Sequence, residues 1–489
     1  MINIDRAELR NPEFHFREPV SFTIEHGENI AFVGPNGGGK SVLAQTITGK
    51  YLLRNGYIRY DTTLMPVYKN IRFISFKDSY GPADSSYYLQ QRWNSQDSEE
   101  SPLVRDTLAG VLGGDCDNSL LSLFDVDKML DKQLVLLSSG EMRKFQLTKM
   151  FLNSPQILII DNPFIGLDVD SRTLLNDLLE KLAVTGSVQI ILLLSNTNDI
   201  PDFITHIVSV DNMRCGKKIK RCDFRDIKPV MLFTGDFYPP GTFVASDIAK
   251  ISGDFEKAFD SCNKNGESDI IIDMRNVSIR YGEHTILESV NWTVRRGEKW
   301  SLLGRNGSGK STLLGLVCAD NPQGYACDIS LFGTRRGSGE SIWEIKRRIG
   351  YVSPEMHRSY SENIPAINIV ASGLHDSIGL YVRPKPEHFA VCEWWMNAFG
   401  ILHLKDRMFL QLSDGEQRMV LLVRAFVKDP ELLILDEPLH GLDERNRLLV
   451  REIIDAFCRR PGKTFIMVTH YEHELPQCID NSLVLSKVN

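Results

Sequence analysis

GPNGGGKS at residues 34–41 and GRNGSGKS at residues 304–311 decide the architecture of this 489-residue chain. Each segment follows a short apolar run and precedes a stretch with helical character. Glycines in this pattern let backbone N–H groups turn inward around phosphate oxygens, and the helix that follows adds the positive end of its dipole. The sequence therefore predicts two phosphate-binding loops, each at the carboxyl end of a parallel strand in an α/β fold.

Both loops carry the side chains that nucleotide binding requires. In the pattern G-x-x-x-x-G-K-S, the lysine reaches the β- and γ-phosphates of a nucleotide, and the serine hydroxyl ligates Mg²⁺. We expect the phosphates of ATP to be held by Gly34, Asn36, Gly37, Gly39, Lys40 and Ser41 in the first loop, and by Gly304, Asn306, Gly307, Gly309, Lys310, Ser311 and Thr312 in the second.

The chain repeats its motifs once. The two loops are 270 residues apart (304 − 34), and three further motifs recur 275 residues apart (412 − 137). The pairs are LSSGE at 137–141 with LSDGE at 412–416, ILIIDNP at 157–163 with LLILDEP at 432–438, and GLD at 166–168 with GLD at 441–443. Such ordered recurrence indicates a duplicated domain. We expect a first domain at 1–211, a connector at 212–267 and a second domain at 268–489.

An aspartate ends an apolar strand in each copy. Asp161 follows ILII and Asp436 follows LLIL, at 121 and 126 residues after the loop lysines (161 − 40 and 436 − 310). An apolar run that ends in aspartate is common by itself, usually where a strand meets a turn. Its recurrence at a matching distance indicates a carboxylate that approaches Mg²⁺. The predicted metal-site residues are therefore Ser41 with Asp161, and Ser311 with Asp436.

The composition limits the possible functions. The chain is 42% hydrophobic, and its apolar runs are far shorter than the roughly 20 residues that cross a membrane. The first residues lack the pattern of a secretory signal, and the nine cysteines form no C-x-x-C pair. We therefore expect a cytoplasmic protein without a disulfide framework. A net charge of −7 disfavours a broad nucleic-acid-binding face, and the basic residues between 217 and 228 are expected to be a solvated part of the connector.

Together these motifs make the chain similar to the ATP-binding cassette (ABC) ATPases, over nearly all of its length outside the connector. The resemblance implies two cassettes, each with a parallel-sheet core and a helical subdomain, packed head to tail. In that family each ATP lies between one copy's phosphate loop and the other copy's signature loop. Ser413 and Gly415 would then complete the first site, and Ser138 and Gly140 the second.

The resemblance also implies an aromatic residue that stacks on the adenine ring. Tyr281 stands at that position in the second copy. At the same offset the first copy has Asn11, with Phe14 and Phe16 nearby.

The resemblance further implies two unequal sites. After the strand aspartate the second copy has Glu437, which can polarise the attacking water, and its MVTH segment places His470 as the family's switch histidine. The first copy has Asn162 after its aspartate and, by our alignment of LLLSN, Asn196 in place of the histidine. Because an amide is not a base at neutral pH, we expect ATP hydrolysis mainly at the Glu437 site. Another carboxylate, such as Asp168, would compensate for Asn162 in the alternative interpretation.

The family's lid glutamine is missing from both copies. Where IGYVPQ is usual, the chain reads IRFISF, ending in Phe76, and IGYVSPE, which contains Pro354 and Glu355. That glutamine normally touches Mg²⁺ and relays closure to a membrane partner, so its loss argues against conventional transport coupling. The tandem Trp394 and Trp395 are expected to belong to the core.

Residues 321–353, the tandem arrangement and the chain length look like the ModF-type bacterial ATPases, which are named for an association with molybdate transport. The resemblance favours an ATP-binding subunit that works with separate membrane permease subunits in an importer, for molybdate if the name applies. A soluble twin-cassette switch that acts on a ribosome or another assembly, as ABC-F translation factors do, is the second hypothesis. A regulatory ATP-binding module with little turnover is the third.

Overall fold

The computed structural model describes residues 1–75, 102–112, 126–134, 137, 139–151, 155–164, 167, 169–186, 188–224, 268–281, 284–304, 307–360, 362–377, 384–469 and 474–486. The described residues up to Phe224 belong to one compact unit, and most of those from Ser268 onward belong to another. Several residues singled out from the sequence lie outside the described parts, namely Phe76, Ser138, Asp168, Asn306 and His470.

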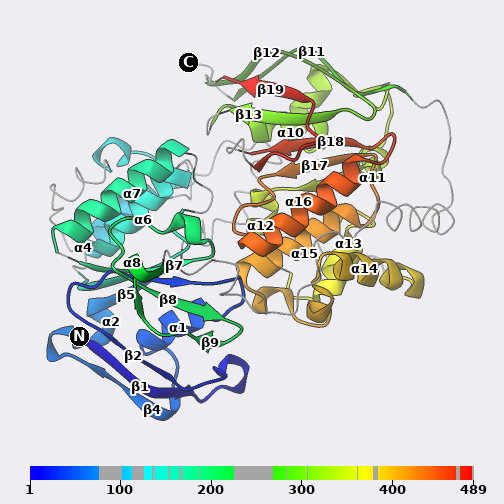
Figure 1. Ribbon diagram of the computed structural model, residues 1–489. Coiled ribbons are helices and arrows are strands. Elements are labelled where there is room, and N and C mark those ends of the chain that lie inside the picture. Colours follow the sequence, from blue (N-terminus) through cyan, green and yellow to red (C-terminus); the bar gives the residue numbers. More distant parts are fainter. Residues whose placement is uncertain are drawn as a thin grey trace. The chain divides into compact units, whose positions relative to one another are not determined.

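The first unit contains an antiparallel and a mainly parallel sheet (Figure 1). The antiparallel sheet has the order β2–β1–β4, and its strands are β1 (Ile2–Leu9), β2 (Val20–Ile24) and β4 (Leu53–Tyr60). The other sheet has the order β10–β8–β3–β7–β6–β5 and is parallel from β8 to β5. Its parallel strands are β3 (Ile30–Val33), β5 (Ile71–Ser75), β6 (Ile157–Asp161), β7 (Gln189–Leu194) and β8 (His206–Asp211).

The parallel strands of the first unit are buried on both faces, which explains their unbroken apolar runs. In β6, Ile157 and Ile159 pack in one core with the antiparallel sheet, whereas Leu158 and Ile160 pack in a second core on the opposite face. The helices of this unit are α1 (Lys40–Ile47), α2 (Val67–Asn70), α4 (Val104–Leu112), α6 (Ser139–Phe151), α7 (Val169–Val184) and α8 (Arg221–Phe224). Helix α1 contributes to the first core, and α4, α6 and α7 contribute to the second.

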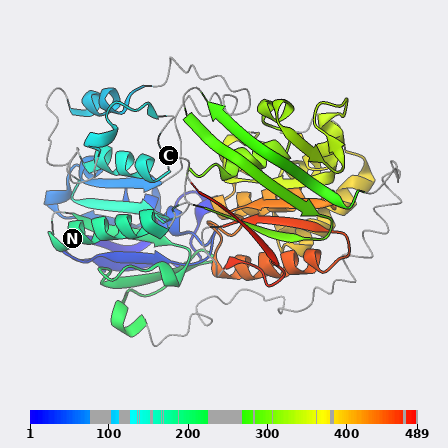
Figure 2. The same cartoon turned by 90° about the horizontal axis from the view of Figure 1, so that it is seen from above.

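The second unit has the same two kinds of sheet. Its antiparallel sheet has the order β12–β11–β14–β15, with β11 (Ile270–Tyr281), β12 (His284–Arg295), β14 (Asp328–Leu331) and β15 (Thr334–Arg335). Figure 2 shows β11 and β12 in green as a long pair of neighbouring strands. The parallel sheet has the order β16–β17–β18–β13–β19, with β13 (Lys299–Gly304), β16 (Ile349–Val352), β17 (Leu432–Asp436), β18 (Thr464–Val468) and β19 (Asn481–Leu485).

Helices cover the second unit's parallel sheet and form a separate helical layer. They are α10 (Lys310–Val317), α11 (Ile342–Arg348), α12 (Pro354–Ser359), α13 (Ala366–Ser372), α14 (Pro386–Ala398), α15 (Asp414–Phe426) and α16 (Glu444–Cys458). Trp395 of α14 is buried, and its ring centroid lies 5.5 Å from that of Phe426 in α15. Trp394 is half-buried beside it. The expectation that these tryptophans belong to the core is therefore confirmed for Trp395.

The strand orders confirm the duplication. The first unit's parallel strands run β5–β6–β7–β3–β8, and the second unit's run β16–β17–β18–β13–β19, so each strand has a counterpart in the same place. In both units the phosphate loop follows the fourth strand of this order, β3 or β13, and leads into the helix that begins at the loop lysine. Two α/β cassettes with parallel sheets are thus present, as predicted.

Residues just after Asp211 still belong to the first unit. The short strands β9 (Arg214–Cys215) and β10 (Ile219–Lys220) both pair with β8. Lys218 forms an ion pair with Glu28 at 2.7 Å, which ties this segment to the cassette. The described residues from Asn212 to Phe224 therefore belong to the first unit, beyond its predicted end, because the edge of β8 pairs with β9 and β10. Lys218 is engaged in the fold, and is not part of a solvated connector.

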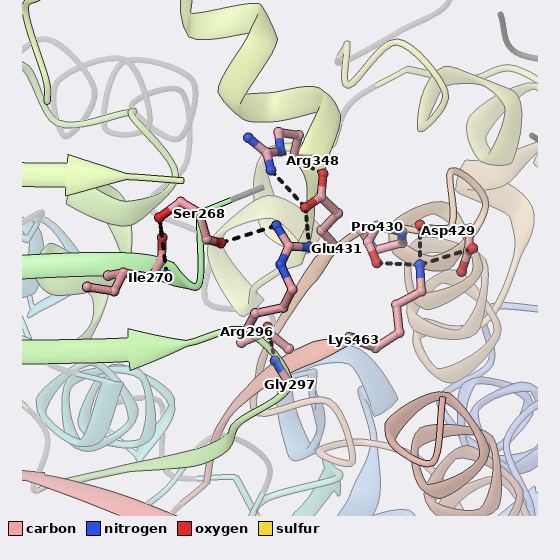
Figure 3. Close-up of polar contacts among 10 residues, drawn as sticks. Ser268, Ile270, Arg296, Gly297, Arg348, Asp429, Pro430, Glu431 and Lys463 are labelled. Carbon is pink, nitrogen blue, oxygen red and sulfur yellow. Dashed lines mark hydrogen bonds and ion pairs between the residues drawn. The ribbon is translucent and has the colours of Figure 1, made fainter. Parts of the chain in front are cut away.

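A polar network joins the two sheets of the second unit at the amino ends of its parallel strands (Figure 3). Glu431, just before β17, accepts hydrogen bonds from Arg348 at the end of α11 and from Arg296 in the turn between β12 and β13. Arg296 also reaches the backbone oxygen of Ser268, before β11. Lys463 donates to the backbone oxygens of Asp429 and Pro430. The network lies at the edge of the sheet opposite to the phosphate loop.

Candidate nucleotide sites

The first phosphate loop is shaped by tight backbone contacts. A Cβ on Gly34 would lie 1.8 Å from the backbone oxygen of Val210 in β8, so only glycine fits there. Gly39 has a φ of 106°, in the region that favours glycine, and it is the residue before α1. The loop can therefore turn sharply from β3 into the helix and leave the first N–H groups of α1 available to a ligand.

Lys40 lies folded against its own loop. Its Nζ donates to the backbone oxygens of Gly34 at 2.7 Å and Pro35 at 2.8 Å. Burial lowers the pKa of Lys40 to about 8, although the carboxylate of Asp161 acts in the opposite direction. A phosphate anion would compensate for that burial, because an opposite charge nearby favours the protonated amine.

The structure brings the first copy's two predicted metal-site residues together. Ser41 Oγ, in the first turn of α1, donates to Asp161 Oδ2 at 2.6 Å. Asn162 Nδ2 donates to the other carboxylate oxygen of Asp161 at 3.1 Å. A hydroxyl beside a carboxylate provides the oxygen donors that Mg²⁺ takes from proteins, so this pair fits the predicted site.

The second phosphate loop repeats the main features of the first. Gly309 has a φ of 90° and precedes α10, and a Cβ on it would lie 2.7 Å from Cδ2 of Leu287. Lys310 Nζ donates to the backbone oxygen of Gly304 at 2.6 Å. Gly307 has a φ of 77°, and its counterpart Gly37 in the first loop has a φ of 72°. Ser311 and Thr312 follow in the first turn of α10.

Asp436 is a buried carboxylate at the end of β17. Burial raises its pKa well above the usual range, the charges of Glu355 and Glu437 raise it further, and Lys310 acts in the opposite direction. An accumulation of acidic groups in a buried place favours a bound cation. Asp436 therefore fits its predicted role, and Glu355, from the first turn of α12, adds a carboxylate to this environment.

The residues after the two aspartates share one backbone conformation. Glu437 has a φ of 50° and its N–H donates to the Val468 oxygen at 2.9 Å, while Asn162 has a φ of 47° and donates to the Leu193 oxygen at 2.9 Å. Asparagine tolerates this left-handed region, whereas a longer side chain such as glutamate is rarely found there. The second copy thus carries a glutamate in a strained position, as is common at functional sites.

Ser195, and not Asn196, is the first copy's counterpart of His470. Asp161 pairs with Leu193 and Asp436 pairs with Val468, so two further residues lead to Ser195 and His470 respectively. Ser195 Oγ lies 2.8 Å from Asn36 Oδ1 and 3.2 Å from Asn162 Oδ1. Our alignment with Asn196 was wrong by one residue, although the 275-residue offset of the repeat gives Ser195. Asn196 instead accepts a hydrogen bond from the Asn198 N–H.

The signature segment of the second copy forms a helix start. Ser413 precedes α15 and is held in a reciprocal cap, in which its Oγ accepts from the Glu416 N–H and Glu416 Oε2 accepts from the Ser413 N–H. Gly415 is buried in the first turn of α15. In the first copy, Gly140 likewise lies in the first turn of α6. Both segments thus lie at helix N-termini, where the helix dipole favours an anion.

The predicted adenine contacts are placed differently in the two copies. Tyr281 ends β11, and its hydroxyl accepts a hydrogen bond from Asn321 Nδ2 at 3.0 Å, with burial raising the pKa of the phenol. In the first copy Phe14 packs on Tyr51, with ring centroids 5.1 Å apart. Phe16 is buried, and its Cε1 would lie 3.4 Å from a Cβ on Gly39. Phe16 is therefore an aromatic residue beside the first phosphate loop, and Asn11 is exposed.

Comparison with known proteins decides the family. The sequence profile described as "ABC transporter" matches residues 17–165 and 287–440, which include both phosphate loops and both strand aspartates. The chain belongs to the ABC transporter family. It is an ABC-type ATP-binding protein with two cassettes, and such proteins are ATPases. In the part of the chain that the structure describes, no helix is both long and apolar enough to cross a membrane.

Relatives of this ABC protein match it along most of its length. It is 33% identical to the "ABC transporter ATP-binding protein ModF" of Escherichia coli, across 94% of this chain and 92% of that protein. It is 28% identical to an uncharacterized ABC transporter ATP-binding protein of Schizosaccharomyces pombe, across 94% and 93% of the two chains. A structure titled "Model of ribosome-bound archaeal Pelota and ABCE1" shares the fold, with a TM-score of 0.58 at 18% identity over 94% of this chain and 73% of that one.

Proposed function

We propose that this chain binds MgATP at both phosphate loops and hydrolyses it mainly at the site that contains Glu437. The difference between Glu437 and Asn162 carries this proposal, because both residues occupy the same backbone position after the strand aspartate. A carboxylate there can accept a proton from the attacking water, whereas an amide cannot. In each site the serine and aspartate would hold Mg²⁺, which would neutralise negative charge during phosphoryl transfer.

The residues of the first site favour ATP binding over ATP hydrolysis. Asn162 donates to Asp161, and its side-chain oxygen faces Ser195, so its amide is committed to neighbours of the same cassette. Ser195 replaces the histidine that the second copy carries at 470. Lys40, Ser41 and Asp161 nevertheless carry the groups that would contact phosphate and Mg²⁺, which supports ATP binding without fast turnover.

Steady-state ATPase assays on Glu437→Gln test the unequal sites. Removing a general base lowers turnover by about 100-fold or more, and we expect that loss for Glu437→Gln with MgATP binding retained. Asn162→Gln is the matched control, because it changes the equivalent residue of the other cassette without removing a base. Near-wild-type turnover in Glu437→Gln would refute the proposal.

We further propose that the ATPase serves as the ATP-binding subunit of an ABC importer, with permease subunits encoded separately. The similarity to the Escherichia coli ABC transporter ATP-binding protein ModF supports this role. Molybdate is proposed as the cargo only through the ModF-type resemblance. Affinity capture with Glu437→Gln, which should accumulate the ATP-bound form, tests the role. Recovery of an integral membrane permease is expected, and recovery of soluble partners alone would refute it.

A soluble ATP-driven switch is the second candidate, and the lid region favours it. Ser353 caps α12, and Pro354 and Glu355 begin this helix where the family has its glutamine. A proline has no N–H and no polar side chain with which to relay closure to a permease. In the same capture experiment, a ribosome or another soluble assembly that copurifies only with the Glu437→Gln variant would support the switch.

A further inference from the structure

A tight turn after β17 brings a histidine back onto Glu437. The N–H of His440 donates to the backbone oxygen of Glu437 at 3.3 Å, which closes the turn. His440 Nδ1 consequently lies 2.7 Å from Glu437 Oε2, within ion-pair distance. The two side chains are only 5% and 13% exposed, so water screens this contact weakly.

The turn is held from outside by the signature helix of the same unit. Arg418 of α15 donates a hydrogen bond to the backbone oxygen of His440. Pro438 and Leu439, between the two interacting residues, are buried. The position of the imidazole is therefore set by the fold, and does not depend on a freely rotating surface side chain.

The contact with the carboxylate is attractive only if Nδ1 carries a proton. That proton can belong to the neutral tautomer or to the imidazolium ion. Glu355, Lys310 and Arg418 act electrostatically on the adjacent Asp436, as Glu437 does. The contact has the distance of an ion pair and not the alignment of a hydrogen bond at Nδ1. His440 would therefore hold Oε2 of Glu437 by charge, or by a hydrogen bond after a small rotation of the ring, and would leave Oε1 as the carboxylate oxygen that can accept a proton from water.

The repeat supplies an independent observation. His440 and Glu437 occur together in the second copy, in DEPLHGLD. At the same offset the first copy reads DNPFIGLD, with Asn162 in place of the glutamate and Ile165 in place of the histidine. Histidine is thus present in the copy that has a carboxylate to orient, and an apolar residue stands in the copy that has none.

We propose that His440 is a positioning residue that holds the Glu437 carboxylate in the orientation required to activate water. This inference rests on the proposed role of Glu437 as the base. The proton leaves the water for Oε1 as the water oxygen bonds to the γ-phosphorus and the bond to the β-phosphate oxygen breaks. His440 makes no bond to substrate in this step. It reduces the freedom of a side chain whose misplacement by about 1 Å can lower a rate about 100-fold.

The test compares His440→Ala, His440→Asn and Ile165→Ala with the wild-type chain and Glu437→Gln. Steady-state MgATP hydrolysis gives kcat and KM, equilibrium titration with MgATP gives binding, and thermal melting reports folding. We expect His440→Ala to lower kcat by about 10- to 100-fold, with KM and binding within about twofold. His440→Asn, whose amide N–H can take the place of Nδ1–H, should recover most of the rate. Ile165→Ala should keep the wild-type kcat.

The outcomes separate this inference from the proposed function. Wild-type kcat in His440→Ala, with Glu437→Gln inactive, would overturn the positioning role and leave Glu437 as the base. Equal losses in His440→Ala and His440→Asn, accompanied by weaker MgATP binding or a lower melting temperature, would show a structural role and also overturn it. An active Glu437→Gln would overturn the proposed function itself.

Discussion

We expect Glu431→Gln to lower the free energy of unfolding of the second unit by about 2 kcal/mol. Arg348 donates to Glu431 through Nε at 2.6 Å and Nη2 at 2.8 Å, and Arg296 donates through Nη1 at 2.9 Å (Figure 3). Glutamine keeps one acceptor oxygen but removes the negative charge that both guanidinium groups share. Its amide N–H₂ group also meets a donor where the second carboxylate oxygen stood.

The magnitude follows from the partial burial of the network. Breaking a buried ion pair costs about 3–5 kcal/mol, and an exposed pair contributes about 0–1 kcal/mol. The side chains of Arg296, Arg348 and Glu431 are 19%, 33% and 35% exposed, which places the network between these limits. For a unit of this size the loss corresponds to a fall of about 4–8 °C in the melting temperature.

In the first copy, neutral residues stand where Glu431 and Arg348 form an ion pair in the second copy. Gln156 precedes β6 as Glu431 precedes β17, and Asn70 precedes β5 as Arg348 precedes β16. The Gln156 Nε2 donates to Asn70 Oδ1 at 3.3 Å, and the backbone bonds between these residue pairs are equivalent at 2.9 and 3.0 Å. The double variant Glu431→Gln with Arg348→Asn recreates this neutral pair, so we expect it to be more stable than the sum of its single variants predicts.

Urea unfolding followed by tryptophan fluorescence measures the effect, because five of the six tryptophans belong to the second copy. Glu452→Gln, at an exposed site on α16, is the control for a simple change of charge. An unchanged unfolding midpoint in Glu431→Gln would refute the reasoning. Strict additivity in the double variant would show that the arginine and the glutamate are not coupled.

Two further predictions concern the stability of the second unit at low pH and ATP turnover at the first nucleotide site. Burial acts to raise the pKa of Glu431, but Arg348 and Arg296 hold it below its usual range. Its stabilisation is therefore present above the unfolded value of about 4.3 and is lost as the pH falls through the folded value, so the urea midpoints of wild type and Glu431→Gln should converge below about pH 4. In a Glu437→Gln background, Asn162→Glu with Ser195→His should raise ATP turnover by about 10-fold or more. Turnover no higher than in the parent variant would contradict the idea that these two residues disable the first site.

Local sequence patterns predicted those site residues whose position depends only on residues nearby in the chain. A glycine loop between an apolar strand and a helix has few alternative structures, so Lys40, Ser41, Lys310 and Ser311 were proposed from spacing alone, and each lies in the first turn of the helix that follows its loop. Repetition at a constant offset then identified the duplicated fold and the strand aspartates. The contact between Ser41 and Asp161 agrees with that prediction, because both lie at the carboxyl edge of one sheet.

The sequence by itself thus determined that the chain has two phosphate-binding cassettes, and it determined that only one of them carries the carboxylate and histidine after its strands. Only the tertiary structure decided which residues surround those groups. Strand register showed that Ser195, and not Asn196, corresponds to His470. Backbone pairing with β8 placed residues as far as Lys220 in the first unit, and a closed turn placed His440 against Glu437. These outcomes depend on hydrogen bonds between segments that are distant in the sequence and on the direction in which a turn points its side chains. The periodicity of the sequence does not indicate either of them.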